Sequence, residues 1–236
     1  MNSEDPRILR LRAVRKRALQ GGGEGRTARQ HAKGKWTARE RIEQLLDPDT
    51  FQELEPFVID QRSECDLEAE EHLGEGVVAG YGQVAGRMVY VYAQDFTIHG
   101  GTMSEMHSRK ICQVMDLAAA GGHPIIGLID SGGARIKQGV KTLGGYAQIF
   151  RRNAQYSGIV PQITVIMGPC VGGAAYSPAL TDVIIMVERQ AFMFLTAPEV
   201  IKAVAGEEIS LEDLGGTEVH TGLSGTAHLS APSEEA

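Results

Sequence analysis

PIIGLIDSGGAR (124–135) and ITVIMGPCVGGAAYSPAL (163–180) each run from an apolar stretch through a glycine-rich turn into a helical pattern. An apolar run that stops at Gly-Gly before a helical pattern predicts a strand, a tight turn and a helix N-terminus. Two such turns that face each other can hold a carbonyl oxygen with backbone N–H groups while it becomes an oxyanion. The alternative is that the glycines only allow positive φ in ordinary connections. Two turns in succession favour the oxyanion interpretation.

Strand and helix patterns alternate on both sides of these turns. The predicted strands cover 50–59, 76–84, 87–95, 124–130, 162–167 and 182–187. The predicted helices cover 7–20, 103–120, 139–156 and 173–180, with a further helix that starts at a Thr37 and Glu40 capping box and is closed by Asp47-Pro48. Ala85-Gly86 joins two of the strands as a hairpin. Repeated strand and helix units indicate a layered α/β fold, but periodicity does not separate a doubly wound sheet from a spiral of ββα units.

The first 50 residues are basic, with twelve Lys or Arg against seven Asp or Glu, whereas the whole chain carries a net charge of −7. Residues 7–20 place Leu11, Val14 and Ala18 on one helical stripe, so this arm is expected to pack on another subunit or on its own body. GGGEGR (21–26) is expected to break the helix as a hinge or mobile loop. No nucleic-acid-binding motif accompanies the basic residues, so no nucleic-acid partner is expected.

Composition is typical of an enzyme without a membrane span. The chain has 236 residues, of which 42% are hydrophobic, and no apolar run approaches the roughly 18 residues that cross a bilayer. The charged N-terminus lacks the apolar centre of a signal peptide, which predicts a cytoplasmic protein. The three cysteines are too few and too scattered for a disulfide framework, and are expected to be buried or incidental thiols: Cys65, Cys112 and Cys170.

Several other polar residues are expected to be structural. Asp130 is expected to cap the turn that follows it by accepting backbone N–H groups. Glu105 and Asp116 are expected to be solvated, and the acidic segment 64–75 to be an exposed loop. Two pairs of histidines are spaced eight apart, which does not fit a zinc site, so no metal is expected: His99 with His107, and His220 with His228.

Other uses of glycine-rich turns fit less well. Neither turn has the Gly-x-Gly-x-x-Gly spacing of a dinucleotide site, and no Lys-Ser/Thr pair follows as in a P-loop. Ser131 and Ser177 lack the Gly-x-Ser-x-Gly frame of an α/β-hydrolase. Cys170 lies inside the second turn without an evident base, so a nucleophilic role is not expected.

The segment MGPCVGGAAYSPALTDVIIM (167–186) resembles the crotonase superfamily's strand, Gly-x-x-x-Gly-Gly turn, helix and following Asp. Residues 34–229 as a whole resemble the carboxyltransferase β subunits of biotin-dependent acyl-CoA carboxylases, typified by propionyl-CoA carboxylase. The other stretches that carry this resemblance are GKWTARERIEQLLDPDTF (34–51), GEGVVAGYGQVAGR (74–87), QDFTIHGGTMSEMHSRKI (94–111), DSGGARI (130–136), GGYAQIF (144–150), SGIVPQITVI (157–166) and DLGGTEVHTGLSGTAH (213–228). Lys137 and Gln138 depart from the family's pattern, which has an amide and then a carboxylate there.

The resemblance implies an α/β fold of the ClpP/crotonase type, a spiral of ββα units. It divides the chain into a basic helical arm with a glycine-rich hinge, 1–33, and the N-terminal domain of a carboxyltransferase, 34–236. The family continues beyond Ala236, so the chain is expected to be a truncated piece or one part of a split subunit. Such a half is expected to bind acyl-CoA without completing the transfer alone.

The activity implied is transfer of a carboxyl group between biotin and the α-carbon of a short acyl-CoA, with the thioester enolate held by backbone N–H groups. The resemblance places these donors at Ala134 and Gly173, with Gly133 and Gly172 letting the chain approach closely. Gly173 is expected to lack a side chain because one would crowd the ligand. The residues expected to contact substrate are Ser131, Gly132, Arg135, Val171, Ala174 and Tyr176.

The implied cofactor is biotin on a separate carrier, and the implied substrate is a coenzyme A thioester. The implied partners are a biotin carboxyl carrier, a biotin carboxylase subunit and the C-terminal carboxyltransferase half, in a homo- or hetero-oligomer. Localisation would be cytoplasmic, or the mitochondrial matrix in a eukaryote. Two alternatives stay open: the α subunit of a methylmalonyl-CoA or glutaconyl-CoA decarboxylase, and a non-catalytic subunit that binds CoA or acts as a scaffold.

Overall fold

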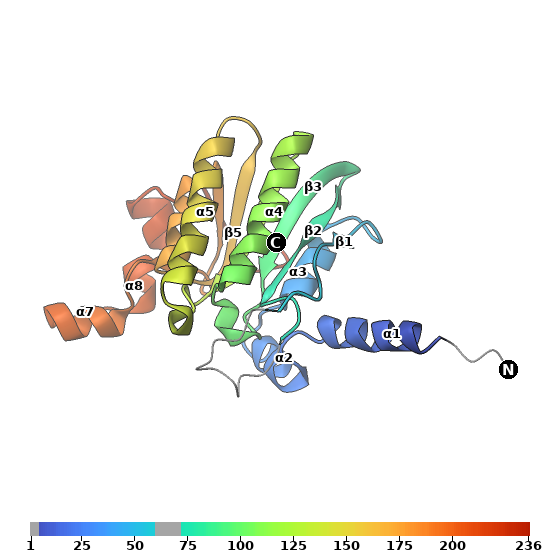
Figure 1. Ribbon diagram of the computed structural model, residues 1–236. Helices are drawn as coiled ribbons and strands as arrows, with labels where there is room; N and C mark the ends of the chain where they lie inside the picture. The colour runs from blue at the N-terminus through green and yellow to red at the C-terminus, as the bar shows by residue number, and fades with distance from the viewer. Residues whose placement is uncertain (1–4, 60–71) are drawn as a thin grey trace.

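The computed structural model describes residues 5–59 and 72–236, and its centre is one mixed sheet of eight strands within those ranges (Figure 1). The strand order is β1-β2-β3-β4-β5-β6-β8, and β7 pairs with the far end of β5. The β1–β2 and β2–β3 pairs are antiparallel, and the other pairs are parallel. The bounds are β1 Gln52–Glu53, β2 Val77–Val84, β3 Arg87–Gln94, β4 Ile125–Ser131, β5 Gln162–Val171, β6 Val183–Val187, β7 Phe192–Phe194 and β8 Leu229–Ala231.

The predicted hairpin between β2 and β3 is confirmed. Ala85 and Gly86 form its turn, both with positive φ (49° and 73°), as a two-residue hairpin loop requires. The Asp47 carboxylate accepts both backbone N–H groups of this turn, at 3.0 and 2.8 Å. The helix before Asp47 is therefore tied to the hairpin.

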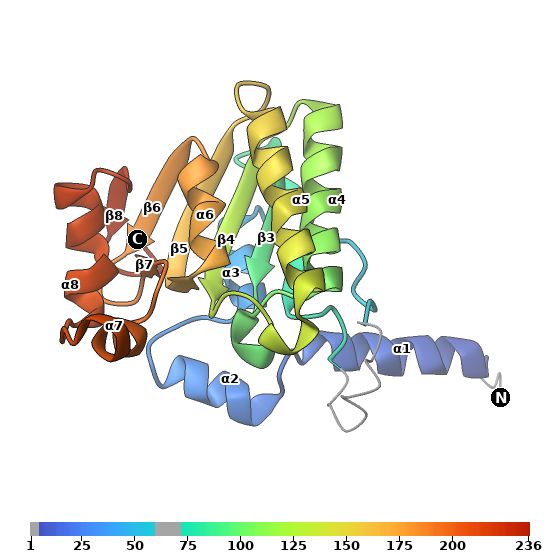
Figure 2. The same ribbon diagram turned by 60° about the vertical axis from the view of Figure 1, so that its left-hand side comes forward.

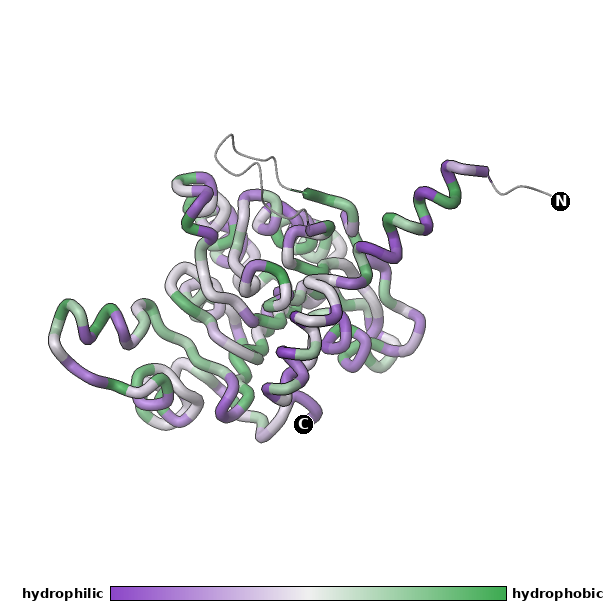
Figure 3. The backbone as a smooth tube through the Cα atoms, turned by 90° about the horizontal axis from the view of Figure 1, so that it is seen from below, coloured by the Kyte–Doolittle hydropathy of each residue, from purple (hydrophilic) through white to green (hydrophobic). Residues whose placement is uncertain are grey.

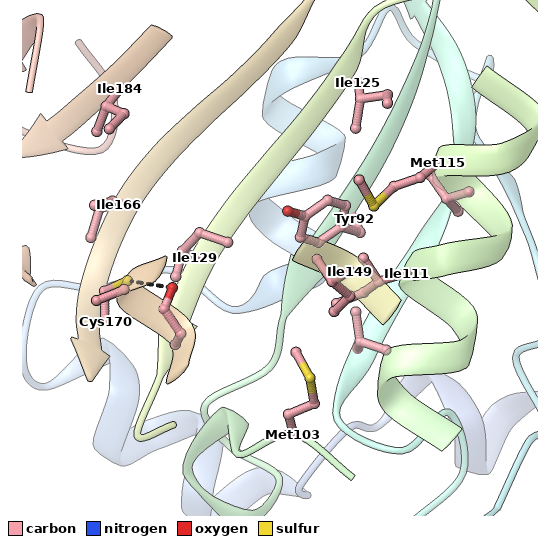
Figure 4. Close-up of a cluster of buried hydrophobic side chains, with 14 of the residues drawn as sticks. Tyr92, Met103, Ile111, Met115, Ile125, Ile129, Ile149, Ile166, Cys170 and Ile184 are labelled. Atoms are coloured by element: carbon pink, nitrogen blue, oxygen red, sulfur yellow. Dashed lines mark hydrogen bonds between the residues drawn. The ribbon is translucent and has the colours of Figure 1, made fainter. Parts of the chain in front are cut away.

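Helices cover both faces of the sheet. Figure 2 shows α4 (Glu105–Gly121) and α5 (Val140–Tyr156) side by side over one face, with α3 (Ala38–Leu45) on the other. Each face has its own apolar core: α4 and α5 bury residues such as Ile111 and Ile149 against the sheet, and α3 buries Ile42. Figure 4 shows side chains of the larger cluster between the sheet and the two long helices. The predicted layered α/β architecture is confirmed.

The helix ends follow their sequence signals. Thr37 caps α3, and its side chain and that of Glu40 form the predicted capping box. Ser104 caps α4 by accepting the His107 N–H at 3.0 Å, and α4 ends at Gly122 in the left-handed conformation. These caps fix where α3 and α4 begin.

The N-terminal arm meets the body only at its end. Helix α1 (Pro6–Leu19) projects away from the sheet, as Figure 3 shows, with Ala18 buried and Leu11 exposed. The expected hinge at 21–26 is wrong for its second half, because α2 (Glu24–His31) begins within it. The Gly22 N–H donates to Thr97 Oγ1 at 2.9 Å, and a side chain at Gly22 would overlap the Thr97 backbone. This turn is therefore packed against the body.

The predictions fail where short elements depend on tertiary contacts. The strand expected over 50–59 is only the two-residue β1, because Glu55 has positive φ and Pro56 follows it. Strand β5 runs past the expected end at 167, because its last residues pair with β7. The helix expected over 173–180 is α6, Gly173–Tyr176, followed by a 3₁₀ turn, Pro178–Leu180. Cys65 and most of the acidic loop expected over 64–75 lie outside the described residues, while Gly74 and Glu75 are buried rather than exposed.

The C-terminal part contains elements that the sequence did not predict. Beyond β7 and β8, these are α7 Pro198–Ala205, α8 Leu211–Gly215 and a π-helical turn Val219–Leu223. Figures 1 and 2 place α7 and α8 at the end of the sheet formed by β8, away from α1. Within the described residues, no helix combines the length and apolarity that crossing a membrane requires.

Candidate active site

The two glycine-rich turns lie side by side at the carboxyl ends of β4 and β5. These strands are parallel neighbours, and Ser131 at the end of β4 pairs with Cys170 near the end of β5. A side chain at Gly133 would place its Cβ 2.6 Å from the Val171 carbonyl oxygen. Gly133 (φ 98°) and Gly172 (φ 60°) both adopt a conformation that other residues rarely take. Glycine at 133 therefore lets the two turns approach each other, and glycine at 172 allows the positive φ of the second turn.

Most backbone N–H groups of the first turn are already used inside the protein. Gly132, Gly133 and Arg135 donate to protein oxygens at 2.9, 3.1 and 3.0 Å. The N–H of Ala134 has no acceptor among the described residues, and Ala134 is only half-buried. One N–H group of this turn is therefore available to a ligand.

The second turn also has backbone N–H groups that no protein atom of the described residues accepts. The Gly172 N–H donates to the Phe194 carbonyl at 3.0 Å, which ties the turn to β7. Gly173 and Ala174 open helix α6, and in the described part of the chain neither N–H has an acceptor. Unpaired N–H groups at the start of a helix are polarised toward an anion or a carbonyl oxygen. Ala134 and Gly173 thus offer uncharged donors on two adjoining turns.

The expected reason for glycine at position 173, that a side chain would crowd the ligand, stays a prediction, and the structure adds a second reason inside the protein. A Cβ there would lie 2.9 Å from the ring of Tyr146, which is itself almost fully buried on α5. The absent side chain therefore makes room for Tyr146, a residue that the sequence analysis did not single out. The only signal was its position inside the matching stretch 144–150.

The polar side chains of the first turn bind within the protein. The buried Ser131 hydroxyl donates to the Gly101 carbonyl at 2.7 Å and accepts the Gly133 N–H. The Arg135 guanidinium donates to Glu75 at 2.7 Å and to the Thr102 carbonyl at 3.2 Å. In the structure these two groups hold the turn, and their predicted contact with substrate stays a prediction.

The remaining predicted contact residues differ in exposure. Gly132 and Tyr176 are exposed, Val171 is half-buried and Ala174 is buried. The Tyr176 ring packs edge-on against Phe150, with 5.8 Å between ring centroids. The exposed Tyr176 ring therefore borders the second turn.

Cys170 is fully buried in the second turn. Its Sγ donates to the Ala174 carbonyl at 3.2 Å, the contact dashed in Figure 4. Burial raises the pKa of this thiol well above its usual range, so it stays protonated. Burial also raises the pKa of Cys112, to about 11. The expectation that these two cysteines are buried thiols is confirmed.

Asp130 has a structural role, but the predicted backbone cap is wrong. Its carboxylate is fully buried and accepts hydrogen bonds from Lys35 at 2.8 Å, Arg41 at 2.9 Å and Gln30 at 3.0 Å. Burial is the main cause that lowers the pKa of Lys35, and Asp130 partly opposes it. Arg41 also binds Glu234 at 2.6 Å. These partners were not predicted from the sequence, although Lys35 and Arg41 lie in the matching stretch 34–51.

Other carboxylates and histidines are engaged away from the turns. Asp116 is not simply solvated, because it binds Arg152 at 2.7 Å and Tyr156 at 2.5 Å, whereas Glu105 is exposed as expected. His107 is buried, its Nδ1 lies 3.0 Å from the Glu75 carbonyl, and burial lowers its pKa to about 3. Among the described residues, no three His, Cys, Asp or Glu side chains cluster as metal ligands would.

A polar cavity of about 400 Å³ lies elsewhere, between α1 and α2. Its described lining includes Arg17, Arg26, Arg29 and His72 around the glycine-rich turn 21–25. None of the predicted site residues lines it. The two adjoining turns, rather than this cavity, carry the proposed chemistry.

The chain is similar to known proteins over almost its whole length. The model of the carboxyl transferase domain family matches residues 29–236. A Bacillus subtilis protein described as a putative propionyl-CoA carboxylase beta chain is 56% identical over 221 residues, which are 94% of this chain and 43% of that protein. The methylmalonyl-CoA decarboxylase subunit alpha of Veillonella parvula is 54% identical over 215 residues, 91% of this chain and 42% of that subunit.

The crystal structure of transcarboxylase 12S with methylmalonyl-coenzyme A and methylmalonic acid bound, described as a hexamer assembly, superposes with a TM-score of 0.96. It is 43% identical, and the match covers all of this chain and 46% of that one. The chain thus spans less than half the length of these relatives. The predicted crotonase-like α/β fold is confirmed, and the chain belongs to the carboxyl transferase domain family, as one half of a subunit similar to the propionyl-CoA carboxylase beta chain.

Proposed function

We propose that this chain is the acyl-CoA-binding, N-terminal half of the carboxyltransferase of a biotin-dependent acyl-CoA carboxylase. In this proposal the thioester oxygen of a short acyl-CoA lies between the backbone N–H groups of Ala134 and Gly173. The observation that carries it is the pair of adjoining turns, each with an N–H that no described protein atom accepts. Membership of the carboxyl transferase family supplies the reaction class.

The chemistry needs a group that stabilises negative charge on the thioester oxygen. When the α-carbon loses or gains a carboxyl group, that oxygen takes on enolate character. Backbone N–H groups fixed by turns stabilise this charge without reorganising during the reaction. Hydrogen bonds from the other N–H groups of both turns to the protein hold Ala134 and Gly173 in place.

The side chains near the turns argue against a base or nucleophile supplied by this half. The Cys170 thiol is buried and protonated, and His107 is buried, neutral and bound to a carbonyl. Biotin on a separate carrier would bring the carboxyl group and take up the α-proton. The N–H donors of the two turns fit a thioester oxygen and are not assigned to biotin. The residues that hold biotin are therefore assigned to the C-terminal half. A biotin carboxyl carrier and a biotin carboxylase subunit complete the proposed assembly.

The substrate class follows from the relatives. The similar transcarboxylase was solved with methylmalonyl-coenzyme A, and the B. subtilis relative is described as a propionyl-CoA carboxylase beta chain. Propionyl-CoA and acetyl-CoA are therefore the proposed substrates. A homo- or hetero-oligomer is proposed by analogy with the hexamer, and localisation in the cytoplasm, or the mitochondrial matrix in a eukaryote, belongs to the same proposal.

A decarboxylase is the second candidate, because the V. parvula α subunit is as similar as the carboxylase relatives. Both classes need the same enolate stabilisation, so the two turns do not distinguish them. A gene for a membrane-bound decarboxylase subunit beside this one would favour the decarboxylase, including one for glutaconyl-CoA. A biotin carboxylase gene would favour the carboxylase. A non-catalytic CoA-binding or scaffold subunit is the third candidate.

The proposed function is tested by mixing the chain with candidate C-terminal halves and free biotin. Biotin-dependent decarboxylation of methylmalonyl-CoA or malonyl-CoA is expected from the mixture and from neither half alone. Acyl-CoA binding without turnover, with every partner that forms a stable complex, would favour the non-catalytic scaffold. Absence of acyl-CoA binding by the folded chain would remove the proposal.

A further inference from the structure

Strands β4 and β5 lose their register directly before the two turns. Their pairing is regular as far as Ile129, whose partner is Ile166, and it resumes at Ser131, whose partner is Cys170. A single residue of β4 therefore stands opposite three residues of β5. Such bulges re-aim the chain that follows them, and here both strands continue into the turns with the free N–H groups.

A buried ionic cluster fills the bulge. The single residue of β4 is Asp130, and its fully buried carboxylate binds Lys35 and Arg41. Opposite it on β5 stands Gly168, where a side chain would overlap both Asp130 and the Lys35 ammonium. Glycine at 168 thus makes room for the cluster between the strands.

Arg41 contacts both strands at this point. One guanidinium nitrogen lies 2.9 Å from Asp130 on β4, and the other lies 3.2 Å from the Met167 carbonyl on β5. Glu234 accepts two further bonds from the same group, at 2.9 and 2.6 Å. The side chains of Arg41, Asp130 and Glu234 are at most 3% exposed. Because the Arg41 guanidinium group is planar, rigid and shielded from water, it fixes the relative positions of the oxygens that accept its hydrogen bonds.

We infer that Arg41 is a positioning residue that sets the offset between the two turns, and with it the placement of the Ala134 and Gly173 N–H groups around one oxygen. The inference rests on the proposed function. Ala134 follows Asp130 by four residues, and Gly173 follows Met167 by six. A shift of either strand at the bulge therefore moves one donor relative to the other.

The test uses Arg41→Lys, which keeps the charge but replaces the planar fork with a single ammonium group. Glu234→Gln is the second variant, because it loosens Arg41 without removing it. The matched control is Arg39→Lys on the same helix. Arg39 also forms a two-point ion pair, with Glu53 at 2.8 and 2.9 Å, but its only other hydrogen bond among the described residues goes to the Ala18 carbonyl and not to β4 or β5.

The readout compares two ligands that differ only in the carbonyl oxygen: propionyl-CoA and its thioether analogue S-propyl-CoA. Two neutral hydrogen bonds to that oxygen should give the wild-type chain a preference of about fivefold to a hundredfold for propionyl-CoA. Arg41→Lys and Glu234→Gln should bring the two dissociation constants within about twofold of each other, with S-propyl-CoA affinity unchanged. Arg39→Lys should keep the wild-type preference.

The possible outcomes distinguish failure of the proposed function from failure of the positioning role of Arg41. A wild-type chain that binds neither ligand, or shows no preference, would remove the proposed function and the inference with it. A wild-type preference that persists in folded Arg41→Lys and Glu234→Gln would overturn the inference alone. Equal weakening of both ligands would show a merely structural role for Arg41 and would also overturn it. If Arg41→Lys does not fold, Glu234→Gln decides.

Discussion

Ala134 and Gly173 contribute only backbone N–H groups to the proposed site. Their small size is important because it leaves room for neighbouring groups. Gly173 is constrained by the buried Tyr146 ring, 2.9 Å from where a Cβ would lie. A substitution there must displace either the ring or the start of α6. The placement of this backbone donor therefore depends on how the Tyr146 ring packs.

Gly173→Ala keeps the backbone N–H, but its methyl group would push the start of α6 away from the Tyr146 ring and move that N–H out of line. Because an oxyanion donor contributes roughly 2.7 to 4 kcal/mol, turnover in the reconstituted enzyme should fall by at least about a hundredfold. Steady-state kinetics against the wild type measures this. Cys170→Ser is the control, since its hydroxyl replaces the buried thiol that donates to the Ala174 carbonyl, and it should keep most activity. An inactive Cys170→Ser beside an active, folded Gly173→Ala would instead point to covalent chemistry.

His107 should make the fold sensitive to mild acid. Its pKa is about 3 in the folded state, because of burial, against about 6.5 when unfolded. Below pH 6.5 the unfolded state takes up a proton that the folded state refuses, so stability is lost as the pH falls toward 3. His107 alone should remove about 2 kcal/mol of unfolding free energy between pH 7 and pH 5.

Urea unfolding of the wild type and of His107→Gln at both pH values checks this prediction. The variant should lose less stability than the wild type over the same interval, whatever its stability at pH 7. Equal losses in the two proteins would mean that His107 is protonated in the folded state.

Helix α3 is the element that connects the N-terminal part to the site, since it carries Arg39 and Arg41. Its start depends on the Thr37 hydroxyl, which accepts the Glu40 N–H and bonds the Glu40 carboxylate. Thr37→Ala should lower the unfolding free energy by about 1 kcal/mol, whereas Thr37→Ser should keep most of it. The stabilities of the two variants are compared through their denaturant midpoints. Equal midpoints would contradict a capping role for the Thr37 hydroxyl.

Sequence patterns were sufficient for elements that carry their own signals. The α3 capping box, the Ala85-Gly86 turn and the alternation around β4 and β5 are local features, and each is confirmed. The short strands β1 and β7 are held by pairing with distant strands, which no local sequence pattern predicts. Likewise, glycine at 173 was recognised, but its close contact with the Tyr146 ring was not, because that contact depends on how α5 packs.

The ionic cluster around Asp130 could not be predicted from local sequence patterns either. Its members come from α2, the segment before α3, α3 itself, β4 and the C-terminal segment. Charged residues so far apart in the chain give no joint pattern, and single buried charges are uncommon enough that solvation is the default expectation. Only the fold brings Arg41 and Glu234 together.

At the scale of the whole molecule, a large apolar stripe remains uncovered. Ile136, Val140 and Leu143 are 89%, 79% and 63% exposed, and their spacing places Val140 and Leu143 on one face of α5. Exposed apolar surface of this kind is typical of an interface. The stripe begins directly after the turn that holds Ala134, so a partner that covers it would also border the site.

The chain should therefore self-associate at tens of micromolar, and Val140→Asp should weaken that association without lowering the melting temperature of the chain. Sedimentation velocity of both proteins measures this. Leu223→Asp, an equally exposed apolar residue away from α5, serves as the control. A wild-type chain that sediments strictly as a monomer would contradict self-association through this stripe.

The central claim is that one thioester oxygen lies between the N–H groups of Ala134 and Gly173. It is tested most directly by infrared difference spectroscopy of propionyl-CoA labelled with carbon-13 at the carbonyl, bound to the chain. Two hydrogen bonds should shift the carbonyl stretch to lower wavenumber than in water, and Gly173→Ala should reduce that shift. A bound thioester whose carbonyl stretch matches that of the free ligand, or is unchanged by Gly173→Ala, would contradict the claim.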